Sequence, residues 1–289
     1  MIETWLIDPF SEFGFMRRAL VGCLALSLGA TPVGVFLLLR RMSLAGDAIA
    51  HAILPGAAIG YLAAGLSLPA MTAGGMVVGL SVALAAGGVA RATLLREDAS
   101  LATFYLISLA AGVMIVSVRG SNVDLLHVLF GTVLALDDAA LLLLASIASV
   151  TLVALALAYR PLVLECCDPS FLKSVGRSSA PVHIGFMALV VLNLVAGFHA
   201  LGTLMAVGIM ILPAAAARMW TRDISRMVPV AMGIALGGSA VGLLLSYHAA
   251  LPAGPAIVLT LGALYLVSLL GGRDGLLLRS LRRRWHYAS

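Results

Sequence analysis

Charged side chains are scarce in this sequence. Only 11% of its 289 residues are Asp, Glu, Lys or Arg, whereas 62% are hydrophobic and the mean hydropathy is +1.09. Soluble domains carry about 25% charged residues, so this composition excludes an ordinary soluble domain. It predicts an all-α protein whose chain crosses a membrane several times.

Lysine is nearly absent, which excludes one common chemistry. The single lysine, Lys173, follows Leu172, so the chain has no phosphate-binding loop of the form G-x-x-x-x-G-K-[ST]. It also has no H-E-x-x-H, and its Ser, His and Asp residues do not order a nucleophile with a base. We therefore expect a protein that is not an enzyme and that does not hydrolyse ATP itself.

Cysteine is scarce as well. Cys23 lies in an apolar run, and Cys166 and Cys167 are adjacent in a segment that we expect in the cytosol, where thiols remain reduced. No further cysteine and no nearby histidine completes a site around the adjacent pair, so we interpret these cysteines as incidental small residues rather than metal ligands.

Long apolar runs, in contrast, recur along the whole chain. Nine are long enough to cross a hydrocarbon core of about 30 Å. They are residues 15–39, 47–66, 69–90, 99–118, 139–159, 182–198, 201–217, 227–247 and 252–271. We expect one membrane domain, 15–272, between an N-terminal interfacial segment, 1–14, and a basic cytosolic tail, 273–289. Eight spans are the alternative, if one of the thinner segments does not cross.

Positive charge is distributed unequally between the two sides of these spans. Lys and Arg are retained in cytoplasmic loops. With the N-terminus outside and the C-terminus inside, only Arg17, Arg18 and Arg119 of the 18 basic residues lie outside. Topology therefore explains the net charge of +5, and nucleic-acid binding is not expected.

Two ionisable residues stand at the start of the second span, in RRMSLAGDAIAHAILPG (40–56). Asp47 and His51 are four residues apart and share one face of a helix, with Cβ atoms about 5–6 Å apart. A carboxylate and an imidazole are ligands for Zn²⁺ or Mn²⁺, and ionisable groups inside a membrane usually mark an ion path. The pattern predicts two metal ligands on a translocation route.

A structural interpretation of the same pair is open. Asp47 would then N-cap the second span, and His51, one turn inside, would be hydrogen-bonded to a neighbour. Pro55 and Gly56 favour the interpretation as a translocation route. They predict a helix break that leaves backbone carbonyls free, and inside a membrane such carbonyls are tolerated only against protein or a cavity.

Proline and small residues predict further features of the packing. Pro213 is expected to kink the seventh span and to leave a carbonyl without its helical donor. Glycines spaced for close helix approach are expected to pack within the chain, and the interface between two copies is the alternative. These are Gly75 and Gly79, and Gly233, Gly237, Gly238 and Gly242.

The segment around Asp47 and His51 also resembles a known family. RRMSLAGDAIAHAILPGAAIGYL is similar to the signature of the permease subunits of bacterial zinc and manganese ABC importers, the ABC-3 family. Similar blocks follow in the expected order: DLLHVLFGTVLAL (124–136), CDPSFLKSVG (167–176), ALGTLMAVGIMILPAAAARM (200–219) and PAGPAIVLTLGALYLVSLL (252–270). The resemblance covers about residues 16–270.

The resemblance implies a transmembrane permease subunit in the bacterial cytoplasmic (inner) membrane, with a fold similar to type II ABC importers. It implies a cytosolic ABC ATPase that uses the ATP, an extracytoplasmic metal-binding protein and a second permease copy as partners. The Asp and His of the family's motif, associated with the cation route, correspond to Asp47 and His51. No permanently bound cofactor is implied, because the metal passes through as cargo.

The same resemblance assigns a role to the longest inner segment, residues 160–181. Asp168 and Pro169 can begin a short helix there, as N-cap and first residue, and Gly176 can end it. Such a helix on the cytosolic face resembles the coupling helix that docks in the ATPase. An ordinary connecting loop is the alternative.

No third metal ligand is assigned. Seven polar residues are candidates, but no helical spacing relative to Asp47 and His51 selects one of them as the third ligand. They are Asp124, His127, Asp137, Asp138, Asn193, His199 and His248. Outer loop and cap positions explain most of them more simply.

We therefore predict the permease subunit of an ATP-driven importer for divalent metal cations, with zinc preferred over manganese. The alternatives are a proton-coupled secondary metal transporter and an ABC permease for chelated iron or cobalamin. Protons compete with metal for carboxylate and imidazole ligands, so uptake is expected to weaken at acid pH.

Overall fold

The computed structural model describes residues 7–65, 67–119, 136–167 and 179–276, and within these ranges the chain forms helices and no strands. The helices are α2 (Asp8–Glu12), α3 (Gly14–Leu39), α4 (Ala45–Ala52), α5 (Leu54–Ala64), α6 (Leu68–Ala92), α7 (Glu97–Arg119), α9 (Asp138–Cys167), α11 (Ser179–Leu201), α12 (Thr203–Trp220), α13 (Ile224–Ala249) and α14 (Ala253–Gly271). In this part of the chain nine spans are long and apolar enough to cross a membrane, with α4 and α5 together forming the second. The predicted all-helical fold of nine spans is confirmed.

The fifth span is longer than predicted. The apolar run predicted an end at residue 159, but α9 continues to Cys167, and Leu162 and Glu165 on its last turns are buried. The first residues of the expected coupling segment, 160–167, are therefore helical. Asp168, Pro169 and Gly176 lie outside the described residues, and their role remains a prediction.

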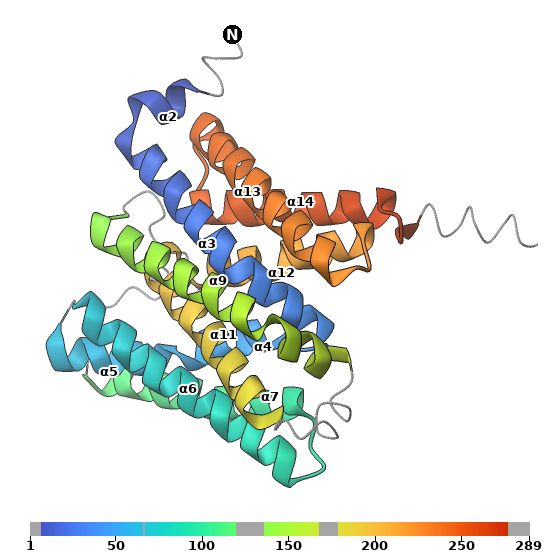
Figure 1. Cartoon of the computed structure of the whole chain (residues 1–289). Coiled ribbons are helices and arrows are strands. Elements are labelled where there is room, and N and C mark those ends of the chain that lie inside the picture. The colour runs from blue at the N-terminus through green and yellow to red at the C-terminus, as the bar shows by residue number, and fades with distance from the viewer. Residues whose placement is uncertain (1–6, 66, 120–135, 168–178, 277–289) are drawn as a thin grey trace, which may run out of the picture.

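The helices are arranged around α3, which runs through the middle of the molecule (Figure 1). Every residue from Gly29 to Leu37 is buried, on all faces of the helix, as expected for a helix surrounded by others. Helices α9, α11, α12 and α13 pack against α3, α14 packs on α12 and α13, and α5, α6 and α7 form a separate layer on the far side of α11.

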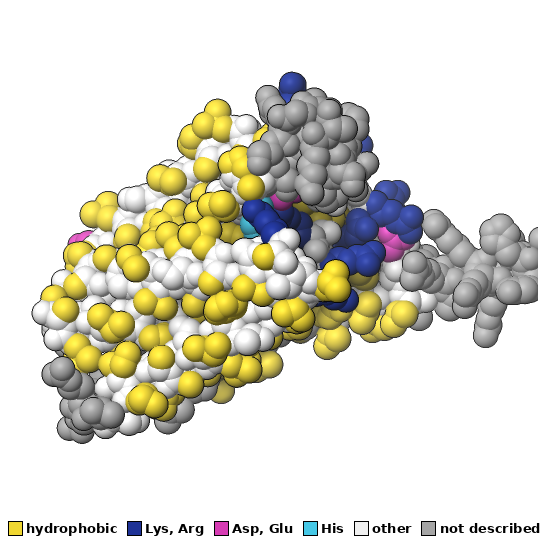
Figure 2. Space-filling view, turned by 90° about the horizontal axis from the view of Figure 1, so that it is seen from below, with side chains coloured by type: hydrophobic (Ala, Val, Ile, Leu, Met, Phe, Trp, Pro, Cys, Tyr) yellow, Lys and Arg dark blue, Asp and Glu magenta, His cyan; other side chains and the backbone are white. Residues whose placement is uncertain are grey.

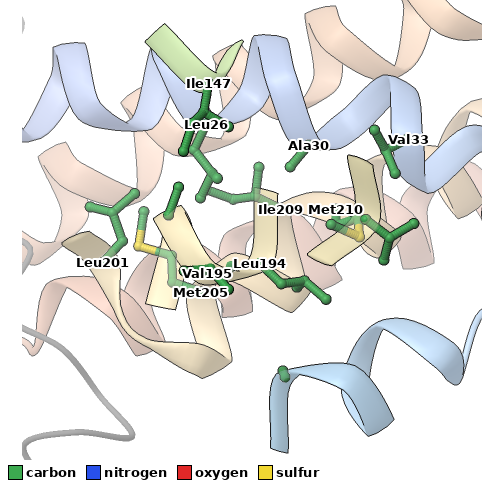
Figure 3. Packing of buried hydrophobic residues seen from close by; sticks show 14 of the residues in the cluster. Leu26, Ala30, Val33, Ile147, Leu194, Val195, Leu201, Met205, Ile209 and Met210 are labelled. Atoms are coloured by element: carbon green, nitrogen blue, oxygen red, sulfur yellow. The ribbon is translucent and has the colours of Figure 1, made fainter. Parts of the chain in front are cut away.

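The core lies between α3, α9, α11 and α12. Figure 3 shows Leu26 and Ala30 of α3 and Ile147 of α9 facing Val195 of α11 and Ile209 of α12. Helices α11 and α12 meet at Gly202, whose φ of 90° lies in the left-handed region that favours glycine. This turn explains how one apolar stretch of about 39 residues forms two spans.

Pro213 leaves a carbonyl free in α12, as predicted. Proline lacks an N–H, so the carbonyl of Ile209, four residues earlier, has no helical donor. The hydroxyl of Thr31 on α3 donates to this oxygen at 3.1 Å, and both groups are buried. The proline therefore creates a polar contact between the two central helices.

Replacing Thr31 with Val should lower the stability of the chain by about 1–3 kcal/mol, because the Ile209 carbonyl then stays buried without a donor. The measurement is the unfolding midpoint of the purified chain in detergent. Thr260→Val is the matched control, since the Thr260 hydroxyl bonds only to a carbonyl of its own helix, that of Ala256. Equal effects of the two replacements would contradict this role of Thr31.

The glycine prediction is confirmed for some positions and wrong for others. Gly75 and Gly79 pack against Ile53, and Gly238 and Gly242 pack against α14. A side chain at either of the remaining two, Gly233 and Gly237, would meet nothing within 4 Å. The first four therefore bring helices together within the chain, as expected, while the last two face outward from α13.

Candidate metal route

Helix α4 carries the two predicted ligands on its exposed face. It begins five residues after Arg40, following Arg41, whose φ of 59° ends α3 in a left-handed turn. The faces bearing Ile49 and Ala52 are fully buried. Asp47 and His51 follow exposed Leu44 along the opposite face, at helical spacings of three and four residues.

Asp47 and His51 lie close enough to bind one cation. The Nε2 atom of His51 is 3.6 Å from Oδ1 of Asp47, and the side chains are 31% and 62% exposed. This separation is too long for a hydrogen bond. Two ligand atoms that are each about 2.0–2.2 Å from a metal would lie roughly 3–3.5 Å apart. Small side-chain movements would therefore bring both atoms into coordination.

The alternative interpretation of Asp47 as an N-cap is wrong. The N-cap of α4 is Leu44, which makes no side-chain capping hydrogen bond, and Asp47 lies inside the first turn. A carboxylate there still interacts favourably with the positive end of the helix dipole. The structure thus leaves the Asp47 oxygens outside any capping bond and exposed.

The predicted helix break is present at Ile53, between α4 and α5. Pro55 has no N–H to donate to the carbonyl of His51, so the helical hydrogen-bond ladder is interrupted next to the ligand pair. The break is backed by α7. Ser108 donates to the carbonyl of Ala52 at 2.9 Å, and Gly112 lies against the ring of Pro55.

Tyr105 lies on the same face of α7, one turn before Ser108, with its ring centroid 6.4 Å from that of His51. The face formed by Tyr105, Ser108 and Gly112 therefore follows the break from His51 to Pro55. The hydrogen bond that this face makes to the site is that of Ser108, and sequence reasoning did not identify this face.

A third ligand is not supplied by the same chain among the residues with described positions, where no group of three His, Cys, Asp or Glu side chains could hold a metal. Several of the residues considered for this role have structural partners. Asp137 caps α9 through the N–H of Ala140, Asp138 pairs with Arg18, and Asn193 donates to Thr151. Asp124 and His127 lie outside the described residues.

Basic residues gather at one end of the molecule, shown in dark blue in Figure 2. At this end, Arg40 follows α3 and pairs with Glu165 of α9, with Nη2 and Oε1 2.5 Å apart. Close by, Nε2 of His183 on α11 lies 2.8 Å from Oε1 of Glu97 on α7. The sequence did not predict these pairs, because their partners are far apart in the chain.

A further pair joins α12 and α14 at their basic ends. Arg222 follows α12 and binds both carboxylate oxygens of Asp274, at 2.7 and 2.6 Å. The hydrogen bonds and the charge of Asp274 raise the pKa of Arg222. This pair belongs to neither α4 nor α7.

Known proteins resemble this chain over nearly its whole length. The model of the ABC 3 transport family matches residues 12–272. The manganese import system permease protein ScaB of Streptococcus parasanguinis is 31% identical over 265 residues, which cover 92% of this chain and 93% of ScaB. The "Probable iron transport system membrane protein" of Haemophilus influenzae is 29% identical, with 92% and 96% covered. The solved structure of PsaBC from Streptococcus pneumoniae in complex with Fab has a TM-score of 0.83 at 29% identity, with 96% and 99% covered. All of these matches therefore extend over the segment that carries Asp47 and His51.

Proposed function

Because the chain belongs to the ABC 3 transport family, we propose that Asp47 and His51 hold a divalent metal cation while it crosses the membrane. The chain is the permease subunit of an ABC importer for divalent metals. It is a multi-pass membrane protein without an ATPase site of its own, and a separate subunit hydrolyses ATP.

The observation that carries the proposal is the ligand pair on the exposed face of α4. A carboxylate that faces lipid is costly, so such residues face a bundle interior, a water-filled cavity or another protein. Asp47 is 62% exposed in a single copy of the chain, and it is the only Asp, Glu, Lys or Arg in the span Ala45–Ala64. This face is therefore expected to line a route rather than to contact lipid.

A second copy of the chain completes the site in this proposal. One copy supplies one carboxylate and one imidazole, whereas stable zinc or manganese sites take four to six ligands. Two copies related by a two-fold axis through the route would present two Asp47 and two His51 side chains to one cation. Isologous dimers of this kind are the commonest oligomers.

The proposed cargo is Mn²⁺, with Zn²⁺ and Fe²⁺ as the alternatives. The relatives include a permease named for manganese import and a protein named for iron transport, and neither of these two names mentions zinc. Carboxylate oxygen suits Mn²⁺, and imidazole suits zinc and iron as well. The preference for zinc that the sequence suggested is therefore replaced by manganese in the proposal.

In the proposed cycle, an extracytoplasmic metal-binding protein delivers the cation to Asp47 and His51. The ATPase docks at the basic end through residues 160–181, and ATP binding and hydrolysis alternate access to the pair from the two sides. With the basic end in the cytosol, the N-terminus lies outside and the C-terminus inside the bacterial cytoplasmic membrane.

Uptake of radioactive Mn²⁺, Zn²⁺ and Fe²⁺ into proteoliposomes tests this function. The vesicles contain the chain with its ATPase and binding protein, with and without ATP. ATP-dependent uptake of one of these cations would support the proposal. Uptake that continues without ATP would identify a secondary transporter, and uptake of chelated iron or cobalamin alone would identify the other alternative.

Acidification of the outer solution should lower the initial rate of uptake. Protons compete with the cation for the carboxylate of Asp47 and the imidazole of His51, so the apparent affinity for metal falls as pH falls. The rate at saturating metal should change less, because excess cation displaces the protons. A rate at low metal concentration that is equal at pH 7 and pH 5 would argue against ligation by these two groups.

A further inference from the structure

Five helix ends meet at the basic end of the molecule, around a pocket of about 460 Å³. Its lining includes Arg40 after α3, Arg91 of α6, Glu97 of α7, Glu165 of α9 and His183 of α11. Two polar side-chain pairs, Arg40 with Glu165 and His183 with Glu97, join helices at this pocket, and each includes a helix that flanks residues 168–178.

The first pair joins the ends of α3 and α9. The side chains of Arg40 and Glu165 are only 9% and 4% exposed, and their charged atoms are in direct contact. The guanidinium of Arg40 also lies over the ring of Phe186 on α11, 5.0 Å from its centroid. A buried charge separated from its partner is strongly unfavourable, so this contact resists any movement of one helix end without the other.

The second pair joins the starts of α7 and α11. His183 is almost fully buried, with 7% of its side chain exposed, and its Nε2 atom is 2.8 Å from Glu97. Glu97 is the first residue of α7, and Ser108 is eleven residues further along the same helix. At a rise of about 1.5 Å per residue, α7 connects the His183–Glu97 contact to the helix break over roughly 16 Å.

Each pair therefore connects a helix flanking residues 168–178 with an element that positions α4. Arg40 stands five residues before α4, so its position sets where that helix begins. Glu97 begins α7, whose Tyr105 and Ser108 contact His51 and the carbonyl of Ala52. Apolar contacts between helices have no preferred direction, whereas the buried Arg40–Glu165 pair and the 2.8 Å contact of His183 with Glu97 join specific atoms of two helices.

We propose that Arg40, Glu165, Glu97 and His183 are positioning residues that transmit movement of α9 and α11 to Asp47 and His51. This inference rests on the proposed function, in which the segment between α9 and α11 docks on the ATPase. The pairs contact neither the cation nor ATP, and they act by moving α4 and α7 together with the flanking helices.

The test compares Glu165→Gln and His183→Gln with the unchanged chain in the assembled importer. Both variants should still assemble with the ATPase, bind Mn²⁺ and hydrolyse ATP, but the amount of Mn²⁺ transported per ATP should fall by about tenfold, within the usual range of coupling between sites. Arg40→Lys keeps the charge that pairs with Glu165 and should retain most of the coupling.

Arg222→Gln is the matched control. It removes one arginine from an ion pair at the same end of the molecule, but Arg222 and Asp274 follow α12 and α14 and belong to neither α4, α7 nor the helices that flank residues 168–178. Transport per ATP should be unchanged in this variant. The inference is overturned if the control falls as far as Glu165→Gln, or if the variants at Glu165 and His183 keep normal coupling. It is equally overturned if they lose assembly, metal binding and ATP hydrolysis together, which indicates a purely structural role.

Hydrogen–deuterium exchange of the purified permease separates this inference from the importer function. Without ATP or cargo, Glu165→Gln should raise exchange in residues 45–52 by about tenfold, the scale of a coupling free energy in the usual range. Arg222→Gln should not raise it. Unchanged exchange in α4 would refute the link even if the importer works. Faster exchange in a chain that transports no metal would support the link and reject the proposed function.

Discussion

Replacing His51 with Ala is expected to abolish uptake of the cargo metal while the chain folds and assembles normally. His51 is one of only two ligands that each copy supplies in the proposed site, and its Nε2 atom faces Asp47 at 3.6 Å. Removing a group that merely supports a ligand lowers metal affinity by about 10- to 100-fold. Loss of a ligand from both copies should lower uptake by at least that factor.

The measurement is initial-rate uptake of Mn²⁺ by proteoliposomes that contain equal amounts of assembled complex. Asp47→Ala should have a comparable effect, and Asp47→Glu should restore part of the rate because it keeps the carboxylate. His199→Ala is the matched control, since that histidine is bonded to the carbonyl of Val195 on its own helix. Normal uptake by His51→Ala and Asp47→Ala would reject the assignment of these residues as ligands.

Replacing Gly34 with Ala is expected to prevent normal packing of the two central helices. A Cβ atom at this position would overlap the backbone carbonyl of Met210 on α12. The obstacle is backbone rather than the flexible end of a side chain, so it cannot move aside without separating α3 from α12. Overpacking in a well-packed core costs about 1–3 kcal/mol and occasionally more, and we expect a loss at or above the upper end.

The unfolding midpoint in detergent and the yield of monodisperse protein measure this effect. Gly233→Ala is the control, because a methyl group there meets nothing within 4 Å. That replacement should leave stability unchanged or raise it by up to about 1 kcal/mol through higher helix propensity. If Gly34→Ala is as stable as Gly233→Ala, the crossing of α3 and α12 is not as close as described.

The number and order of the spans followed from the sequence because the hydrocarbon thickness sets a minimum length for each apolar run. The end of α9 did not follow in the same way. Arg160 and Pro161 are typical of a helix end, and only the burial of Leu162 and the partner of Glu165 explain why the helix continues. The end of α9 therefore depends on contacts between helices, and these contacts cannot be read from the local sequence.

That Asp47 and His51 lie side by side was also predicted from the sequence, since a spacing of four residues alone places them on one face of a helix. The contacts from α7 were not predicted from the sequence. Tyr105, Ser108 and Gly112 form no recognisable motif in an apolar span, and only the structure shows that they lie beside His51, the carbonyl of Ala52 and Pro55. The pairs of Arg40 with Glu165 and of Glu97 with His183 join residues 125 and 86 positions apart, and no spacing rule connects them.

The bond between Thr31 and the carbonyl of Ile209 makes two distant positions mutually dependent. Proline at position 213 is the reason that this carbonyl needs an outside donor, and the hydroxyl at position 31 is that donor. With Ala in place of Pro213, the restored N–H would occupy the carbonyl, and loss of the Thr31 hydroxyl would then cost little. The two substitutions should therefore show strong epistasis, in which the harmful change at position 31 becomes nearly neutral once position 213 has changed. An evolutionary path that loses both residues is expected to lose the proline first.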